Sequence, residues 1–107
     1  MGEANASLRL DKWLWYARFA KTRSLAARLC LTGDVALGGV TVEKAHQMIR
    51  VGDVVTIRLG RSLRRVEIQA LGERRGPAPE ARLLYRETQP PMPIQEREEW
   101  VPLLDPD

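Results

Sequence analysis

Apolar residues follow a helical period near the beginning of the chain. One stripe recurs at spacings of three and four residues: Leu10, Trp13, Leu14 and Ala17. This period predicts an amphipathic helix over residues 8–20. A second stripe has the same spacing: Leu25, Ala26, Leu29 and Cys30. It predicts another helix, which Thr22 can cap and Gly33 can end. Because only residues 20–22 connect the two helices, we expect a hairpin that buries both stripes together.

Beyond the second helix the apolar period changes to two. Alternating apolar residues on either side of Gly38 and Gly39 predict a hairpin over residues 35–42. The same alternation predicts two longer strands at residues 54–59 and 63–71, joined by a turn. One face of the second strand is apolar and the other is polar, as in a half-buried antiparallel sheet.

The last third of the chain has a different composition. Proline and glycine in residues 74–79 indicate a linker, and residues 80–87 are compatible with a short helix. Five prolines among acidic residues predict an irregular tail over residues 90–107. The predicted fold class is therefore α+β, with a helix hairpin packed on a small antiparallel β-sheet. Its parts are a domain over residues 8–72, a linker and short helix that pack on it over residues 73–89, and the proline-rich acidic tail.

Length and charge narrow the classes of function. At 107 residues the chain has the size of one domain, which leaves no room for a catalytic domain beside a binding domain. Residues 1–76 carry a net charge of +7, whereas residues 77–107 carry −4. A basic domain with an acidic tail is typical of proteins that bind polyanions, and a solvated basic surface is the alternative.

Several kinds of chemistry are not expected. Residues 1–7 do not resemble a secretory signal and no apolar run has membrane length, so we expect a cytoplasmic protein without a membrane contact. Cys30 is the single cysteine and sits on an apolar stripe, which argues against a disulfide, a Cys-based zinc site or a nucleophile. His46 is the single histidine and falls in a predicted loop. We therefore expect a protein that is not an enzyme and that holds no metal or cofactor.

The start of the second helix is a candidate anion site. Lys21, Thr22 and Arg23 lie where a helix presents free backbone N–H groups and the positive end of its dipole. A phosphate group suits such a place, and Arg28 on the polar side would extend the basic strip. An ordinary capped and solvated helix start is the alternative.

Aromatic residues occupy the side of the first helix opposite its apolar stripe. Lys12, Trp15, Tyr16 and Phe19 share that side. Aromatic rings beside a lysine can stack on unpaired bases while the ammonium group pairs with phosphate, which makes Trp15 and Tyr16 candidates for base stacking. Core packing is the competing interpretation, and for Trp15 and Phe19 it is the preferred one.

Several short blocks recur in the order and spacing of a known domain. They are residues 9–12, 21–24, 33–35 and 51–55, together with Gly39 and Lys44. Over residues 8–56 the chain resembles the S4-like RNA-binding domain, known as the αL domain. This resemblance implies recognition of structured RNA by shape and backbone contacts. By position, it implies RNA contact for Arg9, Lys12, Lys21, Thr22, Arg23, Arg28 and Lys44.

A narrower likeness extends beyond that domain. It rests on residues 13–15, Arg18 and Phe19, and on Arg74, Arg75 and several residues of 77–85. These are similar to the family of small bacterial heat-shock proteins that bind ribosomes. The likeness implies a stress-response protein that binds ribosomal RNA on the large subunit, particularly free subunits still holding a nascent chain. The chain departs from the pattern at Gly38, where asparagine is usual, and in its acidic tail, where relatives carry a long basic extension.

Two other functions remain open at this point. Similar domains occur fused to RNA-modifying enzymes, so the chain could be a separate RNA-binding subunit of such an enzyme. It could also be a protein-interaction adaptor that docks through Tyr85, Trp100 and the acidic tail. In each case a monomer is the expected state.

Overall fold

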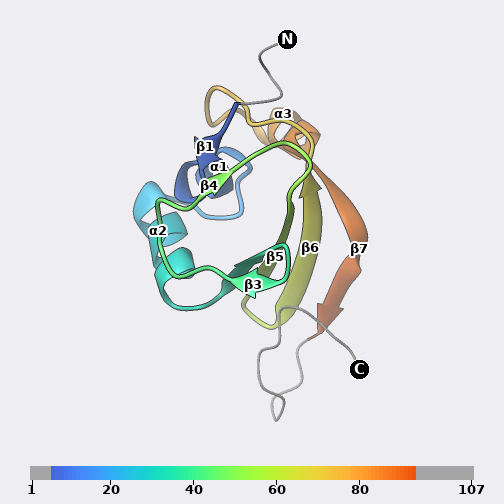
Figure 1. The fold of residues 1–107 in the computed structure, drawn as a ribbon. Helices are drawn as coiled ribbons and strands as arrows, with labels where there is room; N and C mark the ends of the chain where they lie inside the picture. The colour runs from blue at the N-terminus through green and yellow to red at the C-terminus, as the bar shows by residue number, and fades with distance from the viewer. Residues whose placement is uncertain (1–5, 94–107) are drawn as a thin grey trace.

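Two helices lie against a curved antiparallel sheet in the computed structural model, which describes residues 6–93 (Figure 1). Helix α1 spans Leu10–Tyr16 and helix α2 spans Arg23–Leu31. The five-stranded sheet has the order β3-β2-β5-β6-β7, and all of its neighbouring strands are antiparallel. Its strands are β2 Val35–Leu37, β3 Val40–Thr41, β5 Val54–Leu59, β6 Ser62–Ile68 and β7 Tyr85–Pro93. The predicted α+β class and the helix hairpin on a small sheet are confirmed.

The turn chemistry predicted for the first hairpin and for α2 is present. Gly38 and Gly39 have φ values of 58° and 92°, the left-handed conformations that a two-residue hairpin turn requires. The Thr22 hydroxyl oxygen accepts the Leu25 backbone N–H at 3.0 Å and caps α2. After α2, Gly33 has a φ of 80°, and the next N–H reaches back to the Leu29 carbonyl at 3.2 Å. The predictions for the hairpin turn and for the two ends of α2 are confirmed, because each depends on residues that act on their immediate neighbours.

The first helix is shorter than predicted at both ends. Leu8 and Arg9 form strand β1, which pairs with strand β4, Met48–Ile49, so these two residues are extended rather than helical. At the other end, Arg18 adopts a φ of 67° and the Phe19 N–H donates to the Leu14 carbonyl at 2.9 Å. This is a Schellman ending, which stops the helix at Tyr16. The expected helix over residues 8–20 was therefore too long by two residues at its start and by four at its end.

The C-terminal part of the described chain differs most from expectation. Helix α3 covers only Ala78–Ala81, and a 3-10 helix, η2, follows at Arg82–Leu84. From Tyr85 the chain becomes strand β7, which pairs along β6 as far as Pro93. The helix predicted over residues 80–87 was thus wrong in its second half, and the irregular tail does not begin at residue 90. The rest of that predicted tail, residues 94–107, lies outside the described residues.

Strand β7 forms because β6 would otherwise be an edge with unpaired backbone groups. Prolines are tolerated on an edge strand, since they need not donate to a neighbour on the open side. The proline-rich composition therefore hid a strand that pairing with β6 stabilises. The strand predicted at residues 63–71 also ends earlier, at Ile68, because Ile68 pairs with Tyr85, the first residue of β7.

The core lies between the helix stripes and the inner face of the sheet. Trp13, Leu10 and Leu14 of α1 are fully buried, and the indole N–H of Trp13 donates to the Ala70 carbonyl at 3.0 Å. From α2 only the small residues Ala26 and Cys30 are fully buried, whereas Leu25 is 41% exposed. The predicted stripe of α2 was therefore too wide. Among residues 6–93, no helix is long and apolar enough to cross a membrane.

Candidate nucleic-acid interface

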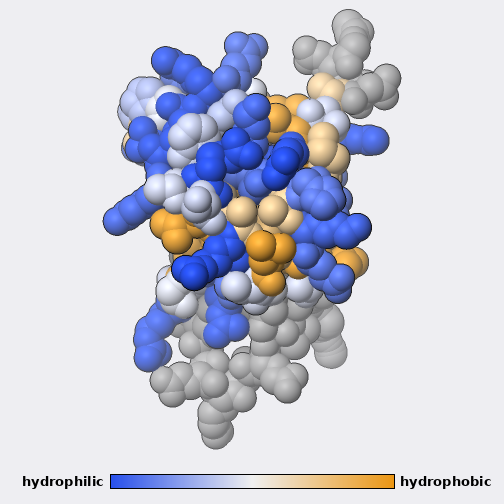
Figure 2. Space-filling model, turned by 90° about the vertical axis from the view of Figure 1, so that its left-hand side faces the viewer, coloured by the Kyte–Doolittle hydropathy of each residue, from blue (hydrophilic) through white to orange (hydrophobic). Residues whose placement is uncertain are grey.

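The side of the molecule where α2 lies is strongly hydrophilic (Figure 2). Figure 2 shows polar and charged side chains over most of this face, with only a few separated apolar ones among them. Of the basic residues implicated by the sequence, Lys21, Arg28 and Lys44 are exposed, and no described residue forms an ion pair with any of them. These side chains are free to meet an anionic partner.

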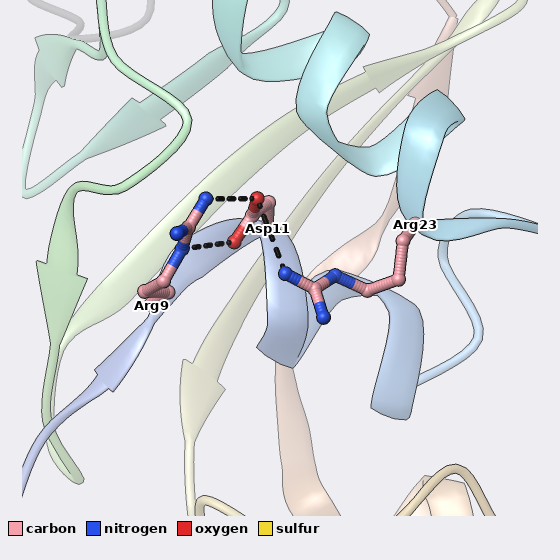
Figure 3. Close-up of polar contacts among 3 residues, drawn as sticks. All are labelled: Arg9, Asp11 and Arg23. Carbon is pink, nitrogen blue, oxygen red and sulfur yellow. Dashed lines mark hydrogen bonds and ion pairs between the residues drawn. The ribbon is translucent and has the colours of Figure 1, made fainter.

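A buried carboxylate organises two of the predicted RNA-contacting arginines (Figure 3). Arg9 donates through Nε to Asp11 Oδ1 at 3.0 Å and through Nη2 to Oδ2 at 2.8 Å. On the other side, Nη2 of Arg23 lies 3.6 Å from Oδ2 of Asp11. The Asp11 side chain is only 3% exposed, whereas those of Arg9 and Arg23 are 47% and 41% exposed. One carboxylate thus holds two guanidinium groups with part of each facing solvent.

Three segments distant in the sequence build this arrangement. Pairing of β1 with β4 fixes the backbone of Arg9, while Asp11 sits in the first turn of α1, where a negative charge is favourable. Arg23 is the first residue of α2. Hydrogen bonding to Asp11, and then the attraction of its charge, raise the pKa of the Arg9 guanidinium above its ordinary value. The cluster carries two positive charges and one negative charge, so it keeps a net positive charge.

The loop that carries Lys44 is fastened beside the same helix start. The Leu10 N–H donates to the Gln47 carbonyl at 2.7 Å, and the Asp11 N–H donates to the Ala45 carbonyl at 3.3 Å. These bonds use backbone N–H groups that the first turn of a helix leaves free. The structure therefore brings the Lys44 loop next to the Arg9, Asp11 and Arg23 cluster. We call Arg9, Asp11 and Arg23 the Asp11 cluster.

The remaining predicted contacts have different surroundings. The hydroxyl oxygen of Thr22 is already engaged in capping α2. Lys12 is half-buried, and its Nζ lies 5.8 Å from the centroid of the Tyr16 ring. Lys21 precedes the cap, and Arg28 lies further along α2 toward its last turn. They extend the basic surface away from the Asp11 cluster without being held by it.

The aromatic side chains are mostly part of the core. Tyr16 and Phe19 are each 7% exposed and belong to the main apolar cluster. The burial of Phe19 agrees with the preferred interpretation, whereas the burial of Tyr16 contradicts its proposed role in base stacking. Trp15 is half-buried, with the Arg75 guanidinium 5.8 Å from its ring centroid. Arg75 also donates to the Trp15 carbonyl at 3.1 Å, so it covers a ring that the sequence left as a stacking candidate.

Two residues of this region carry roles that sequence reasoning missed. In the sequence, Asp11 was only one member of the block 9–12 that matches the S4-like domain. Arg75 was only one of the residues similar to the small heat-shock proteins. The available signal for Asp11 was an acidic residue in the first turn of a helix, flanked by basic residues. Nothing local indicated that Arg75 would reach the carbonyls of Trp15 and Ala20.

The groups considered for catalysis have ordinary structural surroundings. Cys30 is fully buried, and burial raises the pKa of its thiol to about 12, so the reactive thiolate is disfavoured. His46 is exposed in the loop between β3 and β4. Within the described residues, no group of three or more His, Cys, Asp or Glu side chains could hold a metal ion.

Comparison with known proteins gives consistent relatives. A family model described as the S4 domain matches residues 8–55. The heat shock protein 15 homolog of Haemophilus influenzae is 39% identical over 98 residues, which cover 92% of this chain and 74% of that protein. Heat shock protein 15 of Escherichia coli K12 is 44% identical over 81 residues, 76% of this chain and 60% of that protein. The chain therefore spans between three fifths and three quarters of these relatives.

Two further matches extend the comparison. The RQC P-site tRNA stabilizing factor of Halalkalibacterium halodurans is 39% identical over 66 residues, 62% of this chain and 74% of that protein. A solved structure of heat shock protein 15 from Vibrio cholerae superposes with a TM-score of 0.73 at 41% identity, covering 78% of this chain and 83% of that one. That structure is described as trimeric, which stands against our expectation of a monomer. None of these four proteins bears the name of an enzyme.

Proposed function

Because this chain belongs to the heat shock protein 15 family, we propose that it is a non-catalytic protein that binds ribosomal RNA on the large ribosomal subunit. Its role would be in the rescue or recycling of stalled subunits that still carry a nascent chain. The names of the relatives support this, since one of them stabilises P-site tRNA. The cytoplasm, where ribosomes are found, would be its place of action.

The Asp11 cluster is the observation that carries the proposal. A guanidinium group binds phosphate through two parallel N–H donors, but only when its orientation suits the phosphate oxygens. Asp11 fixes that orientation for Arg9 through two hydrogen bonds and attracts Arg23 as an ion pair at 3.6 Å before RNA arrives. Prior fixation reduces the side-chain entropy lost on binding, which favours a structured target whose phosphates occupy definite positions.

The free cations around the cluster supply attraction without fixed geometry. Lys21, Arg28 and Lys44 are exposed and lie on three different segments. Each phosphate that such a side chain neutralises releases condensed counterions, so binding should weaken as salt rises. The surface would therefore combine a general attraction to RNA with a rigid cluster that selects a shape.

Sedimentation with separated ribosomal particles tests this proposal. The full chain is mixed with large subunits, small subunits or whole ribosomes across a salt series, and the bound fraction is measured. We expect preferential co-sedimentation with free large subunits, weakening as salt increases. Lys44→Gln should lower the slope of log K against log salt by about 0.7–0.9, the amount expected for one phosphate contact.

Arg65→Gln is the matched control for that substitution. Arg65 is exposed on β6, away in the sheet from the loop that carries Lys44, so its loss removes the same charge elsewhere. For this variant the slope of log K against log salt should stay close to that of the unchanged protein. Absence of binding to every particle at low salt would overturn the proposal, and equal binding to small and large subunits would overturn its choice of target.

A further inference from the structure

The end of α1 carries an arginine where a glycine is favoured. Both helices end in the same Schellman arrangement, in which the residue after the cap takes a left-handed conformation. In α2 that residue is Gly33, with a φ of 80°. In α1 it is Arg18, with a φ of 67°, the one non-glycine residue with positive φ among residues 6–93. A left-handed conformation strains any residue that has a Cβ atom, so the arginine at this position costs local stability.

Arg18 lines a small cavity together with two other arginines. The cavity has a volume of about 140 Å³ and lies between the end of α1, strand β6 and the segment from α3 to β7. Its basic residues are Arg18, Arg64 and Arg82. Phe19, Ala78 and Ala81 provide apolar walls, and Tyr85 completes the lining. Three arginines from three different segments thus line one cavity.

Contacts hold two of these guanidinium groups in place and leave donors free. Arg18 Nε donates to the Gly76 carbonyl at 2.6 Å, which leaves the other N–H groups of this side chain available. Arg64 pairs with Glu87 and lies 5.1 Å above the centroid of the Phe19 ring. The Arg64 Nε is buried and has no hydrogen-bond partner within the described part of the chain. A buried donor without a partner is costly, so the Arg64 guanidinium group keeps hydrogen-bonding capacity that the described part of the chain does not use.

The charge balance of the cavity favours an anion. Among the lining residues there are three cations and no carboxylate, and Glu87 pairs with one of the cations, Arg64. Arg82 is exposed, and no described residue pairs with it. The cavity volume of about 140 Å³ is well above the roughly 10–15 Å³ that one water needs, so a small anion has room there. Guanidinium groups match phosphate oxygens through paired N–H donors.

We propose that the cavity formed by Arg18, Arg64 and Arg82 is a phosphate-binding site, distinct from the Asp11 cluster, and that bound RNA supplies the phosphate. The source of the phosphate rests on the proposed function, whereas the site itself rests on the cavity. The two sites flank the same seven-residue helix, whose length is about 10 Å. The site would therefore add a second fixed contact to the RNA backbone at the far end of α1.

The first arm of the test uses inorganic phosphate without RNA. Phosphate is titrated into the full chain at constant ionic strength, with chloride as the reference anion, and the arginine Nε–Hε signals are followed by NMR. We expect saturable shifts of the Arg18 and Arg64 signals, and their loss in Arg82→Gln. Shifts no larger than those caused by chloride would overturn the site.

The second arm measures binding of purified large-subunit ribosomal RNA across a salt series. Arg82→Gln and Arg18→Gly should each lower the slope of log K against log salt by about 0.7–0.9. Arg65→Gln removes the same charge from β6 but does not line the cavity, so it is the control and should not change the slope. Unchanged slopes for both cavity variants, with phosphate shifts present, would overturn RNA as the source and leave a site for free phosphate.

Thermal unfolding separates a binding role of Arg18 from a merely structural one. Arg18→Gly places the favoured residue at the end of α1, so the midpoint of unfolding should not fall despite the loss of the bond to Gly76. Weaker RNA binding by an equally stable protein would support the proposal. A lower midpoint with unchanged RNA binding would mean that Arg18 serves the fold. If the unchanged protein binds no RNA, the proposed function fails, and the phosphate titration still decides on the site.

Discussion

Asp11→Asn is the substitution that tests whether the buried carboxylate positions the RNA-binding arginines. An amide keeps the size of the side chain but removes the charge that Arg9 and Arg23 share. Simple electrostatics predicts tighter binding to RNA, because the loss of a carboxylate raises the net charge of the surface by one. If Asp11 positions the two arginines, binding should become weaker, because the substitution releases both guanidinium groups. The two explanations therefore give opposite signs.

The expected loss of RNA affinity in Asp11→Asn follows from the mobility that the Arg9 and Arg23 side chains regain. Fixing one long side chain on binding costs about 0.5–1.5 kcal/mol, and each 1.4 kcal/mol corresponds to tenfold in affinity. Both guanidinium groups keep 41–47% exposure when held, so the cluster restrains them only in part and the lower end of that range applies. Two such side chains then give a loss of roughly five- to tenfold in affinity. The midpoint of thermal unfolding should fall only modestly, since the released groups can reach water.

Binding to free large subunits at two salt concentrations is the assay, with circular dichroism to verify the fold. Glu43→Gln is the matched control, because it also removes one negative charge, next to Lys44, but does not touch Arg9 or Arg23. It should bind slightly more tightly, and more so at low salt. If Asp11→Asn behaved like Glu43→Gln, the positioning role of Asp11 would be refuted.

Two further predictions concern stability. Thr22→Ala removes the cap of α2 and should lower the free energy of unfolding by about 1 kcal/mol, which corresponds to a decrease of about 4 °C in the unfolding midpoint. Thr22→Ser should restore most of this loss. An unchanged midpoint for the alanine variant would show that the cap contributes nothing. The raised pKa of Cys30 means that the folded state disfavours the thiolate, so stability should be constant below about pH 9 and should fall as pH rises toward about 12. Cys30→Ala should lose this decrease in denaturant titrations at pH 7 and pH 10, and an equal decrease in both proteins would assign it to other groups.

The sequence alone was enough for features that neighbouring residues determine. The cap at Thr22, the glycine ending of α2 and the Gly38–Gly39 turn each depend on a few consecutive residues, and all three are present in the structure. The alternation of apolar residues was likewise sufficient for β5 and most of β6. The basic character of the surface also followed from composition, because lysine and arginine side chains are almost never fully buried.

Tertiary structure decided everything that depends on residues far apart in the chain. Residues 8–9 are extended because β4 pairs with them, and residues 85–93 are a strand because β6 offers unpaired backbone groups. Asp11 becomes the centre of a cluster only when β1, α1 and α2 meet, and the arginine cavity exists only when the chain after β6 folds back on the end of α1. Local preferences for helix or strand amount to less than about 1 kcal/mol per residue, so pairing and burial between distant segments override them.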